Sequence, residues 1–314
     1  MKESLSLLLS VLLWAGAQAA WSAERDYVRL VVFSDTHLPG RLIPEKRKAV
    51  DTVNAWDDVD GVAVTGDIAQ GRGTPEEFAF AKDFFSRLKK PLYPITGNHD
   101  FIYDQGPDGK TRKAPPEVRQ AKLESFRKLF GLPGLRYSRK FGRYLCLFVS
   151  ADDLDSPFLA AMSSGTVAWL DAELGRDPDA PAIVFFHAPL EGTIESRNEV
   201  TGVPSFVAQP APGLRELLRR HPKVFLWVSG HTHIGAVNPR FADAKINLYD
   251  GRVHQVHSSD MDGRSYLSAD DVTTTTHDTI WTNSLYLYPD KVVVKTYDHK
   301  QGKWLEGLTR EFRP

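Results

Sequence analysis

Four consecutive residues, Gly97-Asn-His-Asp100, place an amide, an imidazole and a carboxylate side by side. They follow the apolar run 91–96, which has the character of a β-strand, and Asn and Gly favour a turn at this point. The carboxyl end of a strand in an open α/β sheet is where such folds bind their ligands. The tetrapeptide therefore indicates a candidate site, although Asn and Gly also occur there simply as turn formers.

The same arrangement recurs along the chain. Five apolar runs, each predicted to be a strand, end in a residue that could bind a metal: Asp35 with His37, Asp67, Asn98 with His99, His187, and His231 with His233. Because parallel strands bring their carboxyl ends to one edge of a sheet, residues far apart in sequence can meet there. We therefore expect one shared site.

These side chains offer only oxygen and nitrogen donors. That set excludes structural zinc of the cysteine type and suits Mn, Fe or Zn. Each residue also has an ordinary interpretation: His187 as a hydrogen-bonded core histidine, for example, or Asp67 as a turn residue. If all of these residues had only ordinary roles, five independent strand ends would each carry a possible metal ligand by chance.

The elements that must position these residues alternate between strand and helix up to His233. Continuous apolar runs such as 28–33 and 61–65 predict strands covered on both faces. The sequence Thr74-Pro-Glu-Glu77 predicts a helix start, with Thr as N-cap and Glu completing a capping box. Residues 103–116, rich in Gly, Pro, Asp and Lys, predict a long surface loop of the kind that often forms a lid.

From residue 234 onward the pattern changes to short alternating or β-branched runs, at 245–249, 253–257, 279–288 and 292–297. No linker separates this β-rich tail from the strand–helix units. We therefore predict one α/β domain over residues 24–314, with 234–314 as its β-rich C-terminal part.

The composition of the chain limits the classes of function that it could have. Of 314 residues, 42% are hydrophobic, which is enough for a substantial core. Lys plus Arg number 39 against 40 Asp plus Glu, so no broad basic face for nucleic acid is expected. The single cysteine, Cys146, lies in an apolar run and is predicted to be a small buried hydrophobe.

The N-terminus has the pattern of a secretory signal peptide. Lys2 precedes the apolar run 5–14, and Ala17-Gln-Ala19 forms a small-residue cleavage site. The run is short for a membrane span, which needs about 20 residues. We expect residues 1–20 to be a signal peptide and the mature protein to be periplasmic or secreted, without stable membrane insertion. An uncleaved anchor is the alternative.

With these motifs in order, the sequence resembles the calcineurin-like metallophosphoesterase superfamily. Its pattern is D-x-H, GD, GNH[DE], H and GHxH, and the chain shows SDTH at 34–37, TGD at 65–67, GNHD at 97–100, FFH at 185–187 and SGHTH at 229–233. The resemblance implies a four-layer αββα sandwich, in which two mixed β-sheets are flanked by helices. It does not cover the β-rich tail.

The resemblance also implies a site for two divalent cations (Mn, Fe, Zn or a mixed pair). One would be held by Asp35, His37 and His233, the other by Asn98, His187 and His231, and Asp67 would bridge both. A metal-bridging hydroxide would then attack phosphorus in line. His99 would be the catalytic residue that protonates the leaving oxygen or stabilises the transition state. Asp100 is either an outer partner of the site or a turn residue.

Departures from the family pattern indicate which of its subgroups the chain resembles less. Purple acid phosphatases have a Tyr where this chain has Gln70, so a tyrosinate ligand is not available. Protein serine/threonine phosphatases place Asp and Arg in this region; Arg72 is expected to be a solvated loop residue. The stretches SDTHL and TGDIA are most similar to bacterial cyclic-nucleotide phosphodiesterases, whereas the predicted export argues against that substrate.

We therefore expect a metal-dependent phosphoesterase that hydrolyses a small phosphomonoester or phosphodiester. A 3',5'-cyclic-nucleotide phosphodiesterase is the alternative enzyme. A protein that binds metal and a phosphorylated ligand without catalysis is the alternative of another class, disfavoured because a pure binder needs no proton donor at His99. The near-zero net charge argues against the interpretation that the protein is a nuclease. The substrate, the metal pair and the oligomeric state are not predicted.

Overall fold

The computed structural model describes residues 25–193, 204–266, 274–276 and 278–314. Within these ranges, no helix combines the length and the apolar character that a membrane crossing needs. The signal peptide predicted over residues 1–20 lies outside the described residues.

Two mixed β-sheets form the centre of the protein. The first has the order β16-β15-β14-β1-β2-β3, with β17 also paired to β15. Its strands are β1 (Val28–Phe33), β2 (Gly61–Thr65), β3 (Leu92–Ile95), β14 (Trp281–Leu287), β15 (Val292–Asp298), β16 (Lys303–Trp304) and β17 (Arg310–Phe312). Strands β1, β2 and β3 are mutually parallel, and β14 joins β1 antiparallel. The β-rich tail therefore completes the first sheet.

The second sheet has the order β10-β11-β9-β8-β7-β6. Its strands are β6 (Arg136–Phe141), β7 (Tyr144–Val149), β8 (Ala182–Phe185), β9 (Val224–Ser229), β10 (Leu248–Tyr249) and β11 (Val253–His257). Strands β7, β8, β9 and β11 run parallel. The tail strand β11 thus lies beside β9, the strand that leads into His231.

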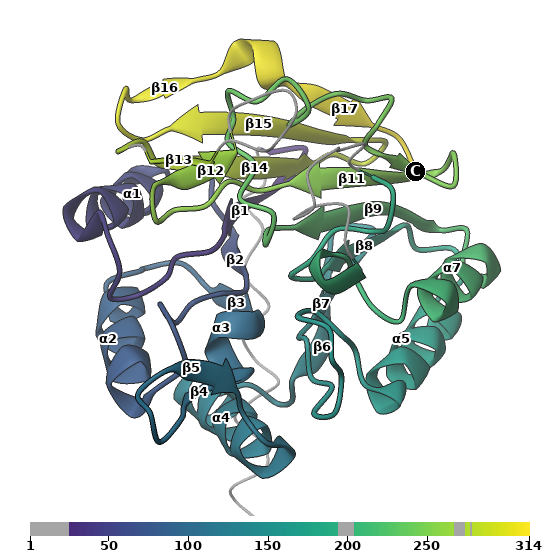
Figure 1. Ribbon diagram of the computed structural model, residues 1–314. Coiled ribbons are helices and arrows are strands. Elements are labelled where there is room, and N and C mark those ends of the chain that lie inside the picture. Colours follow the sequence, from purple (N-terminus) through teal and green to yellow (C-terminus); the bar gives the residue numbers. More distant parts are fainter. Residues whose placement is uncertain (1–24, 194–203, 267–273, 277) are drawn as a thin grey trace, which may run out of the picture.

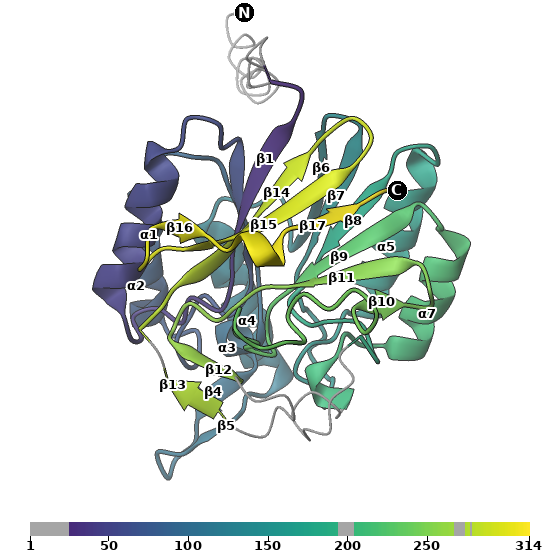
Figure 2. The ribbon, with the colours of Figure 1, turned by 90° about the horizontal axis from the view of Figure 1, so that it is seen from above.

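Helices cover the outer faces of both sheets, as Figures 1 and 2 show, with α1 and α2 on one side and α5 and α7 on the other. The helices are α1 (Ile43–Ala55), α2 (Pro75–Ser86), α3 (Asn98–Phe101), α4 (Pro116–Leu129), α5 (Ser164–Arg176), α7 (Ala211–Arg220) and the 3₁₀ turns η1 (Pro204–Phe206) and η2 (Glu306–Leu308). This arrangement is the predicted αββα sandwich.

The side-chain alternation of β7 explains the layers. Cys146 and Phe148 are in the core between the sheets, whereas Leu145 and Leu147 pack into the separate core that includes Leu170 of α5. Because successive side chains of a strand point to opposite faces, a strand that is apolar throughout is covered on both. Cys146 is fully buried, as predicted.

Two sequence predictions about local structure have different outcomes. The capping box of α2 is present: Glu77 N donates to Thr74 Oγ1 at 3.3 Å, and Thr74 N donates to Glu77 Oε2 at 3.0 Å. The prediction of a long loop over 103–116 is wrong for most of that range, because β4 (Tyr103–Gln105) and β5 (Thr111–Lys113) form an antiparallel hairpin there. A second small hairpin pairs β12 (Arg264–Tyr266) with β13 (Thr274–Thr276).

Candidate metal centre

The predicted site residues follow the carboxyl ends of β1, β2, β3, β8 and β9, at the edge where the two sheets face each other. Backbone hydrogen bonds hold neighbouring strand ends in register: His37 N donates to Asp67 O at 2.9 Å, and Gly230 N donates to His187 O at 2.9 Å. Residues almost 200 positions apart in the chain meet directly, since His231 N donates to Asp35 Oδ1 at 3.2 Å. The parallel-strand rule thus places these side chains correctly.

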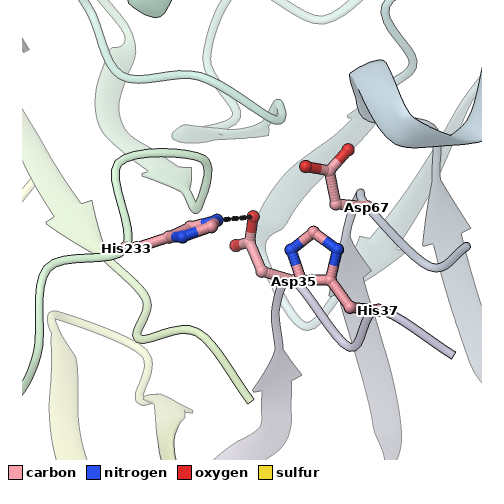
Figure 3. Close-up of side chains that lie close together, drawn as sticks. All are labelled: Asp35, His37, Asp67 and His233. Carbon is pink, nitrogen blue, oxygen red and sulfur yellow. Dashed lines mark ion pairs between the residues drawn. The ribbon is translucent and has the colours of Figure 1, made fainter. Parts of the chain in front are cut away.

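A first group consists of four side chains whose candidate ligand atoms all lie within 4.8 Å of one another: Asp35, His37, Asp67 and His233. Figure 3 shows these side chains together, with His233 Nε2 3.3 Å from Asp35 Oδ1. Asp35, His37 and Asp67 are buried, and neither ring nitrogen of His37 has a hydrogen-bond partner. An unpartnered buried imidazole is costly, and a cation would satisfy it.

A second group consists of Asp67, His187 and His231, again with candidate ligand atoms within 4.8 Å of one another. His187 Nε2 lies 3.4 Å from Asp67 Oδ2 and 3.1 Å from Asn98 Oδ1, so the Asn98 amide belongs to the same group. His231 Nε2 is buried without a partner. Asp67 is common to both groups, which is the arrangement that two cations with one shared carboxylate require.

The backbone at these positions is strained in a consistent way. Seven non-glycine residues of the described chain have positive φ, and five of them are site residues: Asp35 (48°), His37 (43°), Asp67 (49°), His231 (68°) and His233 (51°). Left-handed backbone costs a non-glycine residue about 1–2 kcal/mol. Such outliers cluster at functional sites, where the local geometry is needed to aim side chains.

Two glycines permit the close approach of the loops. A Cβ on Gly97 would collide with Asp67 Oδ1 and would lie 2.6 Å from His187 Cε1. Gly66 has a φ of 93°, and a Cβ there would lie 2.5 Å from His187 Nδ1. The Gly of each motif is therefore required by the packing of the two loops against His187.

The charge states suit cation binding. Burial lowers the pKa of His231 to about 3, so this imidazole is neutral and the lone pair of one ring nitrogen is available. Burial opposes ionisation of Asp35, but the hydrogen bond from His233 holds the pKa of this carboxyl below its usual value. Burial alone would lower the pKa of His187, yet the adjacent Asp67 carboxylate raises it to about 9, so a cation that binds here must displace the Nε2 proton. Negative charge is thus concentrated on the carboxylates of both groups.

Polar contacts at Nδ1 orient two of the histidines. His187 Nδ1 lies 2.8 Å from Thr65 O, a carbonyl that can only accept, so Nδ1 carries the proton and Nε2 is left for a ligand bond. His233 Nδ1 lies 3.2 Å from Asp260 Oδ2, and its Nε2 faces Asp35. Outer partners of this kind orient metal-binding histidines.

His99 lies beside both groups without belonging to either. Its backbone N donates to Asp67 Oδ1 at 2.8 Å, and its Nδ1 lies 3.1 Å from Gly71 O. The carbonyl fixes the proton on Nδ1, which leaves Nε2 as the other exchangeable position of a half-buried ring. The ring centroid is 4.9 Å from that of His37. This position suits a group that exchanges a proton with a bound ligand.

Asp100 positions the turn and the neighbouring loop. Its carboxylate accepts from Gly97 N and from Ala69 N, each at 2.8 Å. Burial and the nearby Asp67 raise the pKa of Asp100 to about 7. These two hydrogen bonds join the turn at Gly97 to the loop that follows Asp67.

Three residues near the site were not predicted. Asp260 contacts His233, Tyr103 Oη accepts from Asn98 Nδ2 at 3.4 Å, and the Phe206 ring stacks on His231 with centroids 5.1 Å apart. Asp260 follows β11, and the rule that located the other residues would have found it, had the run 253–257 been recognised as a parallel neighbour of β9. Tyr103 and Phe206 carry no comparable signal.

The donor set fits two divalent cations. It offers carboxylate, imidazole and amide donors, divides into two groups that share Asp67, and includes buried ring nitrogens with no other partner. Such mixed oxygen and nitrogen sites bind Mn, Fe or Zn and do not single out one of them.

Comparison with known proteins agrees with this chemistry. A family model described as calcineurin-like phosphoesterase matches residues 28–235. The sequence is 27% identical over 212 residues to the glycerophosphodiester phosphodiesterase GpdQ of Enterobacter lignolyticus, covering 66% of this chain and 67% of that protein. It is 25% identical over 176 residues to a 3',5'-cyclic-nucleotide phosphodiesterase of Nostoc sp., covering 56% of each.

The fold is shared with solved structures as well. A dimetal phosphatase from Danio rerio superposes with a TM-score of 0.61, at 13% sequence identity, over 92% of this chain and 99% of that one. At this identity the likeness concerns the fold.

Proposed function

This chain belongs to the calcineurin-like phosphoesterase family and is a metal-dependent phosphoester hydrolase, and we propose that it hydrolyses a small phosphodiester at a two-cation centre. The observation that carries the proposal is the sharing of Asp67 between two groups of buried candidate ligands. The diester preference is supported by the two relatives, both of which are named as phosphodiesterases. A phosphomonoester is the alternative substrate.

The proposed ligands of the first cation are Asp35, His37 and His233, those of the second are Asn98, His187 and His231, and Asp67 binds both. A bound pair of divalent cations supplies a nucleophile from water at neutral pH and neutralises charge on the phosphoryl oxygens. The protein's part is to hold the ligands in place before substrate arrives, through the left-handed loops and the histidine tautomers.

His99 donates a proton to the leaving alkoxide in this proposal. Its Nδ1 is held by Gly71 O, so Nε2 is the atom that delivers the proton. The backbone N–H of His99 binds Asp67, which fixes the distance between the proton donor and the carboxylate common to both cations. Without this proton the leaving group would depart as an unstable alkoxide. General acid catalysis of this kind typically increases the reaction rate by about 10²–10⁴-fold.

The name of the Nostoc relative favours a second candidate, a 3',5'-cyclic nucleotide. The same ligands and the same proton donor serve this reaction, since a cyclic phosphodiester also releases an alkoxide.

We also propose export, on the basis of the signal-like residues 1–20. Fractionation of cells that express the full chain, followed by N-terminal sequencing, tests this directly: intact residues 1–20 in a cytoplasmic protein would exclude it.

Hydrolysis of bis(p-nitrophenyl) phosphate and of p-nitrophenyl phosphate, after metal removal and again after addition of Mn²⁺ or Zn²⁺, tests the function. We expect the diester to be cleaved faster, and Asn98→Ala to abolish cleavage. Asn54→Ala, in which a surface Asn contacts only a helix end, is the matched control and should keep full activity. No more than trace metal together with no activity after metal addition would refute the proposal.

His99→Ala separates the proton donor from the ligands. We expect this variant to bind both cations and to lose turnover by about 10²–10⁴-fold. The loss should be smaller for a p-nitrophenyl ester than for an alkyl ester, because nitrophenolate needs no proton to leave. His221→Ala, which removes a histidine that follows α7 and is paired with Asp171 of α5, is the control. Loss of both cations in His99→Ala would show that His99 is a ligand.

A further inference from the structure

We propose that the loop 258–263, which follows β11, controls the affinity of the first cation position without affecting the second. In this proposal Asp260 is a positioning residue for His233, and Asp262 positions the backbone between Asp35 and His37 by way of Lys46. The inference rests on the metal centre proposed above. The loop lies beyond residue 235, where the match to the family model ends.

The loop is attached to both ligand-bearing sheets. Ser258 N donates at 2.7 Å to the carbonyl of Ser229, the last residue of β9, and Met261 N donates at 3.2 Å to the carbonyl of Ser34. Ser229 is two residues before His231, and Ser34 directly precedes Asp35. Met261 is fully buried. The loop therefore joins the two strand ends whose residues make up most of the first group.

Asp260 acts on His233. The carboxylate is fully buried and places Oδ2 3.2 Å from His233 Nδ1. His233 Nε2 hydrogen-bonds Asp35 Oδ1 at 3.3 Å. When a cation takes the place of that proton, the Asp260 carboxylate, which can only accept, keeps the other proton on Nδ1 and leaves Nε2 as the ligand atom. Arg264 Nε lies 3.3 Å from the same Oδ2 and favours the charged form of Asp260.

Asp262 acts on the loop that carries Asp35 and His37. Its Oδ1 lies 2.7 Å from Lys46 Nζ, and this ammonium donates at 2.6 Å to the carbonyl of Thr36, the residue between the two ligands. Lys46 is fully buried. An uncompensated ammonium bonded to the backbone between two ligands would repel a cation, and the Asp262 carboxylate both anchors Lys46 and neutralises it.

The second cation position is oriented by different groups. The proton of His187 Nδ1 is held by Thr65 O, a main-chain carbonyl of the first sheet, and the His231 ring is stacked on Phe206. Neither contact involves the loop 258–263. A change at Asp260 should therefore weaken the binding of one cation and leave the binding of the other unchanged. A general loss of stability would weaken both.

A titration of metal-free protein with Mn²⁺, with free Mn²⁺ measured by its EPR signal, tests the inference. We expect wild-type protein to bind two Mn²⁺. Asp260→Asn keeps an acceptor of the same size but loses the charge, and should weaken one of the two sites by about 10–100-fold. The other site should keep its affinity, and excess Mn²⁺ should restore the second ion. Equal affinities in wild type and variant would overturn the inference.

The matched control is Asp298→Asn. Asp298 is also buried, but its carboxylate accepts from the backbone N of Lys300 and Gln301 at the end of β15. This control should bind two Mn²⁺ as wild type does. Equal weakening of both sites in Asp260→Asn would mean a general structural role and would also overturn the inference. Absence of binding in wild type, by contrast, would refute the metal centre itself.

A measurement on unmodified protein covers the case in which Asp260→Asn does not fold. In zinc-loaded protein, ¹⁵N NMR of the histidine rings distinguishes a protonated nitrogen from one bound to metal. We expect His233 to carry its proton on Nδ1 and to bind zinc through Nε2. Binding through Nδ1 would place the metal on the Asp260 side of the ring and would contradict the positioning role.

Discussion

Replacement of His37 by leucine should change stability in opposite directions with and without metal. Both ring nitrogens of His37 are buried without a partner, and each such group costs about 1–3 kcal/mol. Leucine removes both groups but must adopt the left-handed backbone at this position, where φ is 43°. His37 already bears the cost of that conformation, about 1–2 kcal/mol, so this cost largely cancels between the two proteins. In chelator, the variant should therefore be at least as stable as wild type.

Addition of Mn²⁺ should reverse this order. A ligand that binds only the folded state stabilises it by about 2.7 kcal/mol at 100 times its dissociation constant. Wild-type protein gains this amount at each cation position, whereas His37→Leu loses it at the first. The difference in unfolding free energy between the two proteins should thus shift by about 2.7 kcal/mol on going from chelator to Mn²⁺.

Urea unfolding followed by tryptophan fluorescence provides the measurement, since the chain has 7 tryptophans. His221→Leu serves as the control, because His221 contacts Asp171 at the end of α7 and should respond identically in chelator and in Mn²⁺. A loss of more than about 2 kcal/mol by His37→Leu in chelator would refute the reasoning from unpartnered nitrogens. A metal-independent difference would refute the role of His37 as a ligand.

Three further predictions concern residues around the site and in the core. Burial raises the pKa of the Cys146 thiol, so Ellman's reagent should leave native protein unmodified and label one thiol after unfolding in urea; labelling of the native protein would contradict this. Burial lowers the pKa of His299 from 6.5 to about 3, so only the unfolded chain takes up this proton as the pH falls through that range. Stability is therefore lost towards acid pH, and His299→Gln should reduce the slope by up to about 1.4 kcal/mol per pH unit; an unchanged slope in urea titrations would exclude the assignment. Asp262→Leu leaves the Lys46 ammonium buried and unpaired, so in chelator it should cost about 3–5 kcal/mol, and adding Lys46→Met should recover most of that; additive losses in the double variant would show that the pair is not coupled.

The ligand positions could be predicted because local and global signals coincide. Each apolar run is long enough to be recognised as a strand, and each is followed within two residues by a ligand type, as Asp67 follows 61–65. Parallel pairing then brings these ends together without any knowledge of side-chain contacts. The left-handed backbone of Asp35 and His233 was not needed for this step, and no residue type at these positions predicts it, since a positive φ is uncommon for residues other than glycine.

Other features depend on contacts between distant segments. The strand 253–257 was predicted as part of a β-rich tail, but its pairing with β9 was not, and so Asp260 was missed. Polar composition at 103–116 concealed the hairpin of β4 and β5, whose short strands consist of polar residues with exposed positions. A strand stabilised by a single neighbour and little burial leaves no periodic apolar signal.

Anomalous diffraction from crystals grown with Mn²⁺ tests the two-cation centre most directly. The proposal predicts two Mn²⁺ peaks, one in contact with Asp35, His37 and His233, the other with Asn98, His187 and His231, and both with Asp67. A single peak, or two peaks of which only one contacts Asp67, would contradict it.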